Sequence, residues 1–189
     1  MKIYAESGNV KCGLLGFDDG DEELLKVITL AEQKEAEDKE GLVISEAKTS
    51  IDWWNDLANM YDRNFCMVQE DGKPIGFIQL GLSEDPVHIT SAYIQPDFRG
   101  HRFVDILFAA CFNYLVEKTK HRLVGGEVFE KNTAALRSVE RNGFQDTLKR
   151  VGEDHVFRIY RRDLSDWKPQ FKPTSVPETN PLDPSSGPG

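Results

Sequence analysis

The sequence has few cysteines and no long apolar segment. Its 189 residues include three cysteines, Cys12, Cys66 and Cys111, and so sparse and odd a set is not a disulfide framework. Because Cys66 and Cys111 lie in apolar stretches, we expect packed thiols rather than reactive ones. No uninterrupted apolar run reaches the ~18 residues of a membrane span, and the opening MKIYAESGNV has no apolar signal core. We therefore expect a cytoplasmic protein in a reducing compartment, without a membrane partner.

Positive charge is also scarce. The chain has 23 lysines and arginines against 32 aspartates and glutamates, a net charge of −9. This balance argues against general nucleic-acid binding, which needs cations to displace the counterions of the phosphates. His101, His121 and His155 have no ligand spacing with cysteines or carboxylates, so no metal site is predicted. A G-x-S-x-G elbow and a P-loop are missing as well.

Proline is concentrated at the C-terminal end of the chain. Residues 166–189 hold six of the nine prolines and almost no apolar periodicity. Such a segment cannot bury enough apolar surface to offset its ordering entropy. We predict one domain over residues 1–163, followed by a proline-rich, extended or disordered tail over 164–189.

Hydrophobic periodicity divides the domain into strands and helices. Segments 2–6 and 11–17 read as extended, 19–38 and 51–61 as helices, and 64–82 as a hairpin whose Asp71-Gly72 turn favours positive φ. Two further strands, two helices and a second hairpin follow. The expected order is β-α-α-β-β-β-α-β-α-β-β, an α/β (α+β) fold with a mixed, mostly antiparallel sheet flanked by helices. The helix near 100–118 is apolar except for one narrow stripe, which includes Arg102, Asp105 and Asn113.

Two local motifs in this order carry a family resemblance. IQPDFRG at 94–100 resembles the V-x-P-x-[YF]-R-G segment that precedes the coenzyme turn of GNAT acetyltransferases, and NTAALRSVERNGF at 132–144 resembles their N-x-x-A-x-x-x-x-E-[KR]-x-G-F helix. The resemblance covers about residues 1–163. It implies a GNAT-like fold, acetyl-CoA as cosubstrate, no metal, and an amine acceptor.

The resemblance also implies a set of coenzyme-binding residues. The unpaired N–H groups of a helix N-terminus bind phosphates, and the family turn reads [QR]-x-x-G-x-[GA]. Here the expected small residues are Arg102 and Val104. Either the backbone amides still bind pyrophosphate and Arg99, His101 or Arg102 supplies added charge, or Arg102 pairs with Asp105 and Val104 narrows the phosphate-binding turn. The expected coenzyme-binding residues are Ile94, Gln95, Arg99, Gly100, His101, Arg102, Phe103, Val104 and Asn132, of which Asn132 is equally a plain helix cap.

The resemblance guides the choice of catalytic residues too. Some family members carry a glutamate base at the position of His88, whose ordinary pKa suits that role; a partly exposed structural histidine is the alternative. Glu127 is the second candidate base. The family's tyrosine acid is Val139 here, and we assign no acid, although Ser138, Tyr93 and Tyr114 carry hydroxyls.

Two classes of function follow from these residues. The first is an acyl-CoA-dependent N-acetyltransferase acting on a primary amine of a small molecule or protein. The eleven acidic residues of 18–46 are either a solvated helix face or an attraction for a cationic amine. The second is a catalytically inactive GNAT-fold assembly or binding protein, including one associated with a virion, that holds a protein partner through its 164–189 tail.

Overall fold

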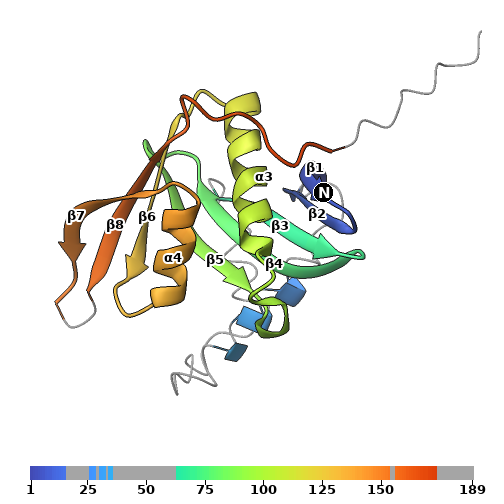
Figure 1. Ribbon diagram of the computed structural model, residues 1–189, viewed down its shortest axis with the longest axis horizontal. Coiled ribbons are helices and arrows are strands. Elements are labelled where there is room, and N and C mark those ends of the chain that lie inside the picture. Colours follow the sequence, from blue (N-terminus) through green and yellow to red (C-terminus); the bar gives the residue numbers. More distant parts are fainter. Residues whose placement is uncertain (16–25, 29, 33, 36–62, 154–155, 174–189) are drawn as a thin grey trace, which may run out of the picture.

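The computed structural model describes residues 1–15, 26–28, 30–32, 34–35, 63–153 and 156–173. A single mixed sheet in the order β1-β2-β3-β4-β5-β6-β8-β7 forms the body of the molecule. All neighbouring strands are antiparallel except β5 and β6. Helices α3 and α4 lie together on one face of this sheet (Figure 1). The strands are β1 Lys2–Ser7, β2 Val10–Leu14, β3 Arg63–Glu70, β4 Lys73–Gly81, β5 Val87–Ile94, β6 Leu123–Phe129, β7 Gln145–Val151 and β8 Phe157–Asp163, and the helices after β5 are α3 Phe103–Lys118 and α4 Thr133–Arg141.

The expected fold class is confirmed, with one change at the N-terminus. The extended piece after the first strand is a full strand, β2, which pairs with both β1 and β3. The described residues of the first predicted helix, 26–28, 30–32 and 34–35, are helical. The second predicted helix, at 51–61, lies outside the described residues. In the β3–β4 hairpin, Asp71 and Gly72 take φ of 50° and 77°, as the turn sequence predicts.

Helix α3 is the central packing element. Its apolar side chains, including Phe108 and Phe112, are buried against the sheet. The cysteines Cys12, Cys66 and Cys111 are all free and buried in the same core, which confirms the prediction of packed thiols. Burial raises the pKa of the Cys111 thiol well above its ordinary value, and it makes this group a poor nucleophile.

One residue of the expected polar stripe on α3 is not at the surface. Asn113 has no exposed area, because residues 164–173, which we call the C-terminal strap, cross over it. The Asn113 amide donates to the carbonyls of Tyr4 and Gln170 at 2.8 and 2.7 Å, and its carbonyl accepts from Trp167 Nε1 at 3.0 Å. The polar side chain is therefore a buried connector rather than a solvated one.

The C-terminal strap continues from β8 across α3 to the N-terminal edge of the sheet (Figure 1). Leu164 is buried, Trp167 packs edge-on against Phe112 with ring centroids 5.1 Å apart, and the Phe171 carbonyl accepts from Glu6 N at 2.7 Å. The strap is thus extended and held by its own chain. Residues 174–189 lie outside the described residues, and the domain boundary at 163 stays a prediction.

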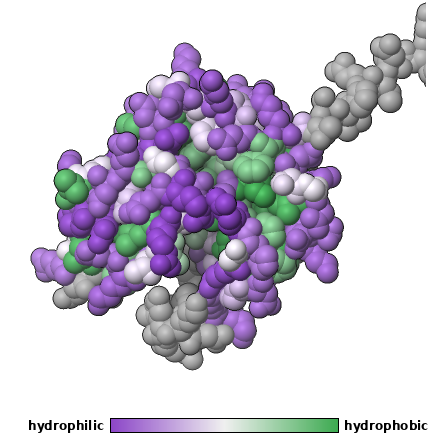
Figure 2. Space-filling view, in the orientation of Figure 1, coloured by the Kyte–Doolittle hydropathy of each residue, from purple (hydrophilic) through white to green (hydrophobic). Residues whose placement is uncertain are grey.

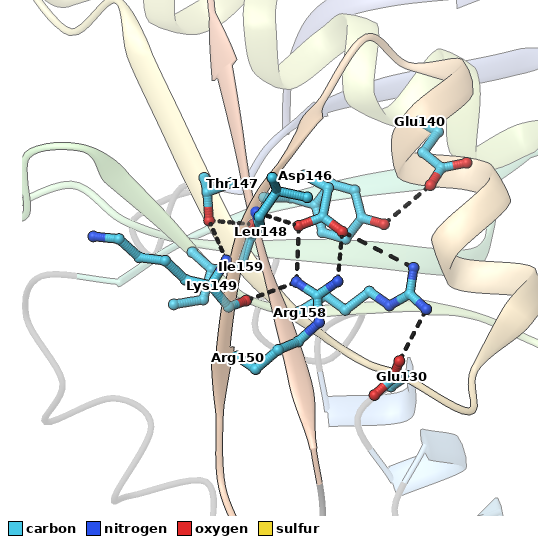
Figure 3. Close-up of polar contacts among 10 residues, drawn as sticks. Glu130, Glu140, Asp146, Thr147, Leu148, Lys149, Arg150, Arg158 and Ile159 are labelled. Carbon is cyan, nitrogen blue, oxygen red and sulfur yellow. Dashed lines mark hydrogen bonds and ion pairs between the residues drawn. The ribbon is translucent and has the colours of Figure 1, made fainter.

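The hairpin of β7 and β8 carries a bulge that α4 and neighbouring side chains support. Between the pairs Asp146–Tyr160 and Arg150–Arg158 the register shifts, and Leu148 takes φ of 64° with 82% of its surface exposed. Asp146 accepts from Leu148 N at 2.7 Å and from both terminal nitrogens of Arg150 at 3.0 Å, which holds the bulge (Figure 3). The buried Tyr160 donates its hydroxyl to Glu140 of α4 at 3.0 Å, so β8 and α4 are joined beside the site described next.

Candidate active site

The site begins where the two parallel strands separate. Strands β5 and β6 pair only from Val87 to Ile89 and from Val124 to Gly126. Beyond Ile89 they diverge, and side chains of α3 and α4 lie over the opening. Beyond this point β5 still pairs with β4 but not with β6, so the backbone polar groups on its β6 side are available to an extended ligand.

Two adjoining cavities occupy this opening. The splay cavity, about 210 Å³, lies among β5, β6, β8 and α4, and its walls include Ser91, Glu127 and Tyr160. The turn cavity, about 700 Å³, reaches from β5 to the N-terminus of α3. The two share walls formed by Ala92, Phe108, Asn132, Ala135 and Val139. Together they form a path from the strand separation to the turn before α3.

The turn before α3 keeps the backbone conformation that favours glycine, although Arg102 stands where the family has that glycine. Gly100 has φ of 85°, and Arg102, at the N-cap of α3, has φ of 64° and ψ of 19°. A non-glycine residue in this left-handed region is uncommon and costs of order 1 kcal/mol. The first N–H groups of α3 therefore point out of the helix as in an anion-binding turn, although the residue that shapes them is an arginine.

The side chain of Arg102 lies outside the turn cavity. Its Nε donates to Asp105 at 2.8 Å, and its side chain is 70% exposed. The pairing of Arg102 with Asp105 that the sequence left open is present. Asp105 also accepts from Arg141 and from Asn142 of α4 at 2.7 and 2.9 Å. Burial acts to raise the pKa of Asp105, but the hydrogen bonds from Arg141, Asn142 and Arg102 outweigh it and leave that pKa below its ordinary value.

Arg99, the first residue of the turn, lies on the side of the turn that faces the turn cavity. Its guanidinium donates to both carboxylate oxygens of Glu35 at 2.7 Å, and its Nε donates to the Ile94 carbonyl at 2.9 Å. It also lies 5.7 Å from the centre of the Tyr93 ring. Arg99, Glu35, Tyr93 and Ile94 all line the turn cavity. A guanidinium is therefore held at the mouth of the cavity, next to the helix N-terminus.

The remaining predicted coenzyme-binding residues lie in different places: some line a cavity, and others contact neighbouring residues of the protein. Val104 lines the turn cavity, and the ring of His101 stacks on Phe103 with centroids 5.7 Å apart. The Gln95 side chain donates to the Pro74 carbonyl at 3.1 Å. Asn132 lines both cavities and also caps α4, since its Oδ1 accepts from Ala135 N at 3.1 Å. Both roles weighed for Asn132 are thus compatible with one position.

The two predicted bases differ in position. Glu127 lines the splay cavity from β6 and is exposed. His88 lies opposite Gly81 of β4 and Gly125 of β6, within the paired part of the sheet. His88 is not among the described residues that line the splay cavity or the turn cavity.

A carboxylate that the sequence did not single out lies beside β5, beyond the part of that strand that pairs with β6. Glu32 lines the turn cavity and accepts from the Ser91 hydroxyl at 2.9 Å. Burial raises its pKa, the Ser91 hydrogen bond acts in the opposite direction, and the nearby Glu35 raises it further. The only signal for it in the sequence was the acidic run at 18–46, because nothing local tells which of eleven acidic residues faces β5.

The position of the family's acid is apolar, and its neighbour is polar. Val139 forms part of both cavity walls. Ser138 lines the turn cavity, and its Oγ is buried without a hydrogen-bond partner among the described residues. Tyr93 lines the same cavity; burial and then Glu35 raise its pKa to about 12. Tyr114 instead packs edge-on against Tyr4 with centroids 5.3 Å apart.

The comparisons with known proteins agree with this arrangement. The family model of the acetyltransferase (GNAT) family matches residues 28–144, and the chain belongs to that family. None of the curated proteins matches the sequence. In the part of the chain that the structure describes, no helix is long and apolar enough to cross a membrane, and no group of side chains could hold a metal ion.

Several solved structures share the fold. A complex of coenzyme A with RimL, an alpha-N-protein acetyltransferase of ribosomal L7/L12, has a TM-score of 0.67 at 12% identity, covering 86% of this chain and 98% of that one. Spermidine N-acetyltransferase SpeG from Vibrio cholerae has a TM-score of 0.64 at 13% identity, covering 85% and 96%. N-acetyltransferase PseH from Campylobacter jejuni has a TM-score of 0.54 at 19% identity, covering 84% and 100%. At such identities the likeness shows the fold alone.

Proposed function

We propose that this protein is an N-acetyltransferase that transfers an acetyl group from acetyl-CoA to a primary amine. The observation that carries the proposal is the path from the separation of β5 and β6 to the N-terminus of α3, with a partly buried carboxylate, Glu32, on its wall. An extended, phosphate-bearing thioester fits such a path. The free backbone of β5 accommodates the extended part, and the positive-φ turn presents helix N–H groups to the phosphates.

The residues of the chain divide the binding between them. Arg99 supplies a guanidinium beside the N–H groups of α3, and Asn132 offers its amide where the two cavities meet. Val104 stands where the family has glycine or alanine and narrows the approach, so backbone and Arg99 carry more of the phosphate binding. Arg102 contributes the shape of the turn rather than its charge, because its side chain lies outside the turn cavity, whereas Arg99, although paired with Glu35, lines that cavity.

We assign the general base to Glu32, with Glu127, which lines the splay cavity, as the alternative. Acetyl-CoA supplies an acyl thioester. Glu32 removes one proton from the acceptor ammonium, and the amine nitrogen bonds to the acyl carbon. The C–S bond then breaks, the nitrogen loses a second proton as the amide forms, and the thiolate takes up that proton through solvent. A raised pKa makes Glu32 a stronger base near neutral pH than an ordinary carboxylate. No side chain is assigned as the acid.

The acceptor is a cationic amine under this proposal. Glu32 and Glu35 lie on one wall of the turn cavity, and the net charge of the chain is −9. Both features attract a cation. The solved relatives named above act on a ribosomal protein and on spermidine according to their descriptions, so a protein N-terminus and a polyamine are the first acceptors to try.

Calorimetric titration with acetyl-CoA, followed by a free-thiol assay over a panel of amines, tests the activity. Binding together with amine-dependent thiol release supports the enzyme; no detectable heat up to millimolar ligand leaves the inactive binding protein as the better description.

A pH–rate profile tests the general base. The rate of thiol release should rise with pH as Glu32 loses its proton, and this rise should lie above the pH range of an ordinary carboxylate. Glu32→Gln should lower kcat at least about 100-fold, the lower end for a general base, and remove this acidic limb.

Matched glutamate-to-glutamine variants distinguish Glu32 from the other candidate bases. Glu127→Gln tests the carboxylate of the splay cavity, and Glu117→Gln on α3 controls for the loss of one negative charge. If Glu127→Gln removes the acidic limb while Glu32→Gln keeps it, the base is Glu127. If both keep it, His88→Ala is the remaining test, and loss of the limb there assigns the base to His88.

A further inference from the structure

A third cavity lies on the far side of the turn from the turn cavity. This strap cavity, about 500 Å³, is an open cavity between the start of α3, the end of α4, β8 and the C-terminal strap. Strongly hydrophilic side chains gather on the face that carries α3 and α4 (Figure 2). The residues that line it are His101, Arg102, Asp105, Ile106, Arg141, Asn142, Gly143, Arg162, Trp167, Gln170 and Phe171.

The strap cavity has an excess of positive charge. Three arginines face a single carboxylate, Asp105, which already binds Arg102 and Arg141. The third arginine, Arg162, is the least engaged of the three. Its Nη1 donates to the Gly143 carbonyl at 3.3 Å, Asp166 is 3.9 Å from its Nη2, and its Nε is buried without a partner among the described residues. The side chain is only 24% exposed, so its charge acts in a partly desolvated place and favours an anion.

The position of the strap cavity indicates which anionic ligand it would bind. His101 and Arg102 of the turn line the strap cavity, while Arg99 and Val104 of the same turn line the turn cavity. A ligand whose phosphates lie on the N-terminus of α3 therefore has the strap cavity next to it. Two aromatic residues of the strap, Trp167 and the 43% exposed Phe171, add apolar surface of the kind on which a purine base packs.

We propose that the strap cavity binds the 3′-phosphoadenosine end of the coenzyme, with Arg162 as the ligand of the 3′-phosphate. The inference rests on the proposed function and goes beyond it, because it gives the C-terminal strap a role in coenzyme recognition. The coenzyme then extends from the splay cavity along the turn cavity, bends over the turn, and ends beneath the strap. Arg102 and Arg141 form ion pairs with Asp105 in the wall of the strap cavity, so Arg162 is the arginine left to bind the 3′-phosphate.

The test compares coenzyme A with dephospho-coenzyme A, which lacks only the 3′-phosphate, by calorimetry on the full chain. The wild-type protein should bind coenzyme A at least tenfold more tightly than dephospho-coenzyme A. Arg162→Gln should bring both to the weaker affinity, and Arg162→Lys should restore part of the difference. Arg161→Gln is the matched control: Arg161 lies against Gly125 on the other face of β8, so the difference should persist.

The outcomes separate this proposal from the proposed function. If both ligands bind the wild-type protein equally, the strap cavity does not hold the 3′-phosphate, and the acetyltransferase proposal stands. If the difference persists in Arg162→Gln, another residue holds that phosphate, and the assignment to Arg162 is overturned. If neither ligand binds, both proposals fail. The comparison of the two ligands on the unaltered protein needs no variant to fold.

Discussion

The turn at 99–104 and the helix motif at 132–144 lie on the same cavity but differ in what they retain. The turn has lost the small residues of its family at Arg102 and Val104, yet Arg102 takes the left-handed conformation and the helix N-terminus stays open. The motif of α4 keeps its asparagine, its glutamate and its glycine, with Gly143 at φ of 81°, yet has valine in place of the acid. Binding through backbone groups tolerates a changed side chain, whereas chemistry that belongs to a side chain is lost with it.

The largest effect should come from restoring the missing side chain. Val139→Tyr places a hydroxyl on the wall shared by both cavities. Because a positioned general acid contributes at least about 100-fold, we expect kcat to rise by about that factor in a free-thiol assay. Val139→Phe supplies the ring alone and should leave kcat unchanged; equal rates for the two variants would mean that no acid is needed.

The turn offers the converse experiment. Arg102→Val puts a β-branched residue where φ is 64°, a strained combination that costs about 2 kcal/mol, so coenzyme affinity should fall about tenfold or more, as measured by calorimetry, with a lower Tm. Arg102→Gly keeps the backbone and loses one exposed ion pair of small value. Because an exposed ion pair contributes little free energy, the coenzyme affinity of Arg102→Gly should stay within about threefold of wild type. A large loss in Arg102→Gly would show that the guanidinium itself is a phosphate ligand.

A smaller effect should separate the two roles of Asn132. Asn132→Ala removes the cap of α4 and should lower the free energy of unfolding by about 1 kcal/mol. Asn132→Asp keeps an oxygen for Ala135 N but loses the amide donor, so stability should be preserved while coenzyme affinity falls several-fold. Denaturant unfolding and calorimetry measure the two quantities. If Asn132→Asp binds coenzyme like wild type, Asn132 is a cap alone.

The smallest effect concerns Asp105, which joins the two regions by accepting from Arg102 of the turn and from Arg141 and Asn142 of α4. Its pKa is lowered in the folded protein, so its stabilisation is present above the ordinary aspartate pKa and is lost as pH falls through the lowered value. Between neutral pH and that range, Asp105→Asn should reduce unfolding free energy by about 1 kcal/mol. The difference between the two proteins should shrink at acid pH; a constant difference would exclude this linkage.

Local patterns in the sequence were sufficient for the fold class. Alternating apolar residues, the Asp71-Gly72 turn and the cap and end of α4 each act over a few residues, and the structure has all of them. The sequence missed the second N-terminal strand as an element of the sheet, since a short piece such as Val10–Leu14 gains its stability from two pairing partners far along the chain. It also placed Asn113 on a solvated stripe, because periodicity does not reveal what covers a helix.

The sequence by itself determined the family, the position of the turn before α3 and the residues at which that turn departs from the family pattern. Only the tertiary structure decided what those departures mean. The left-handed Arg102 with its side chain on Asp105, the approach of Glu32 to Ser91, and the strap that places Trp167 on Asn113 all join residues distant in the chain. Burial, pKa and charge balance at a site depend on such long-range neighbours, and a linear pattern does not contain them.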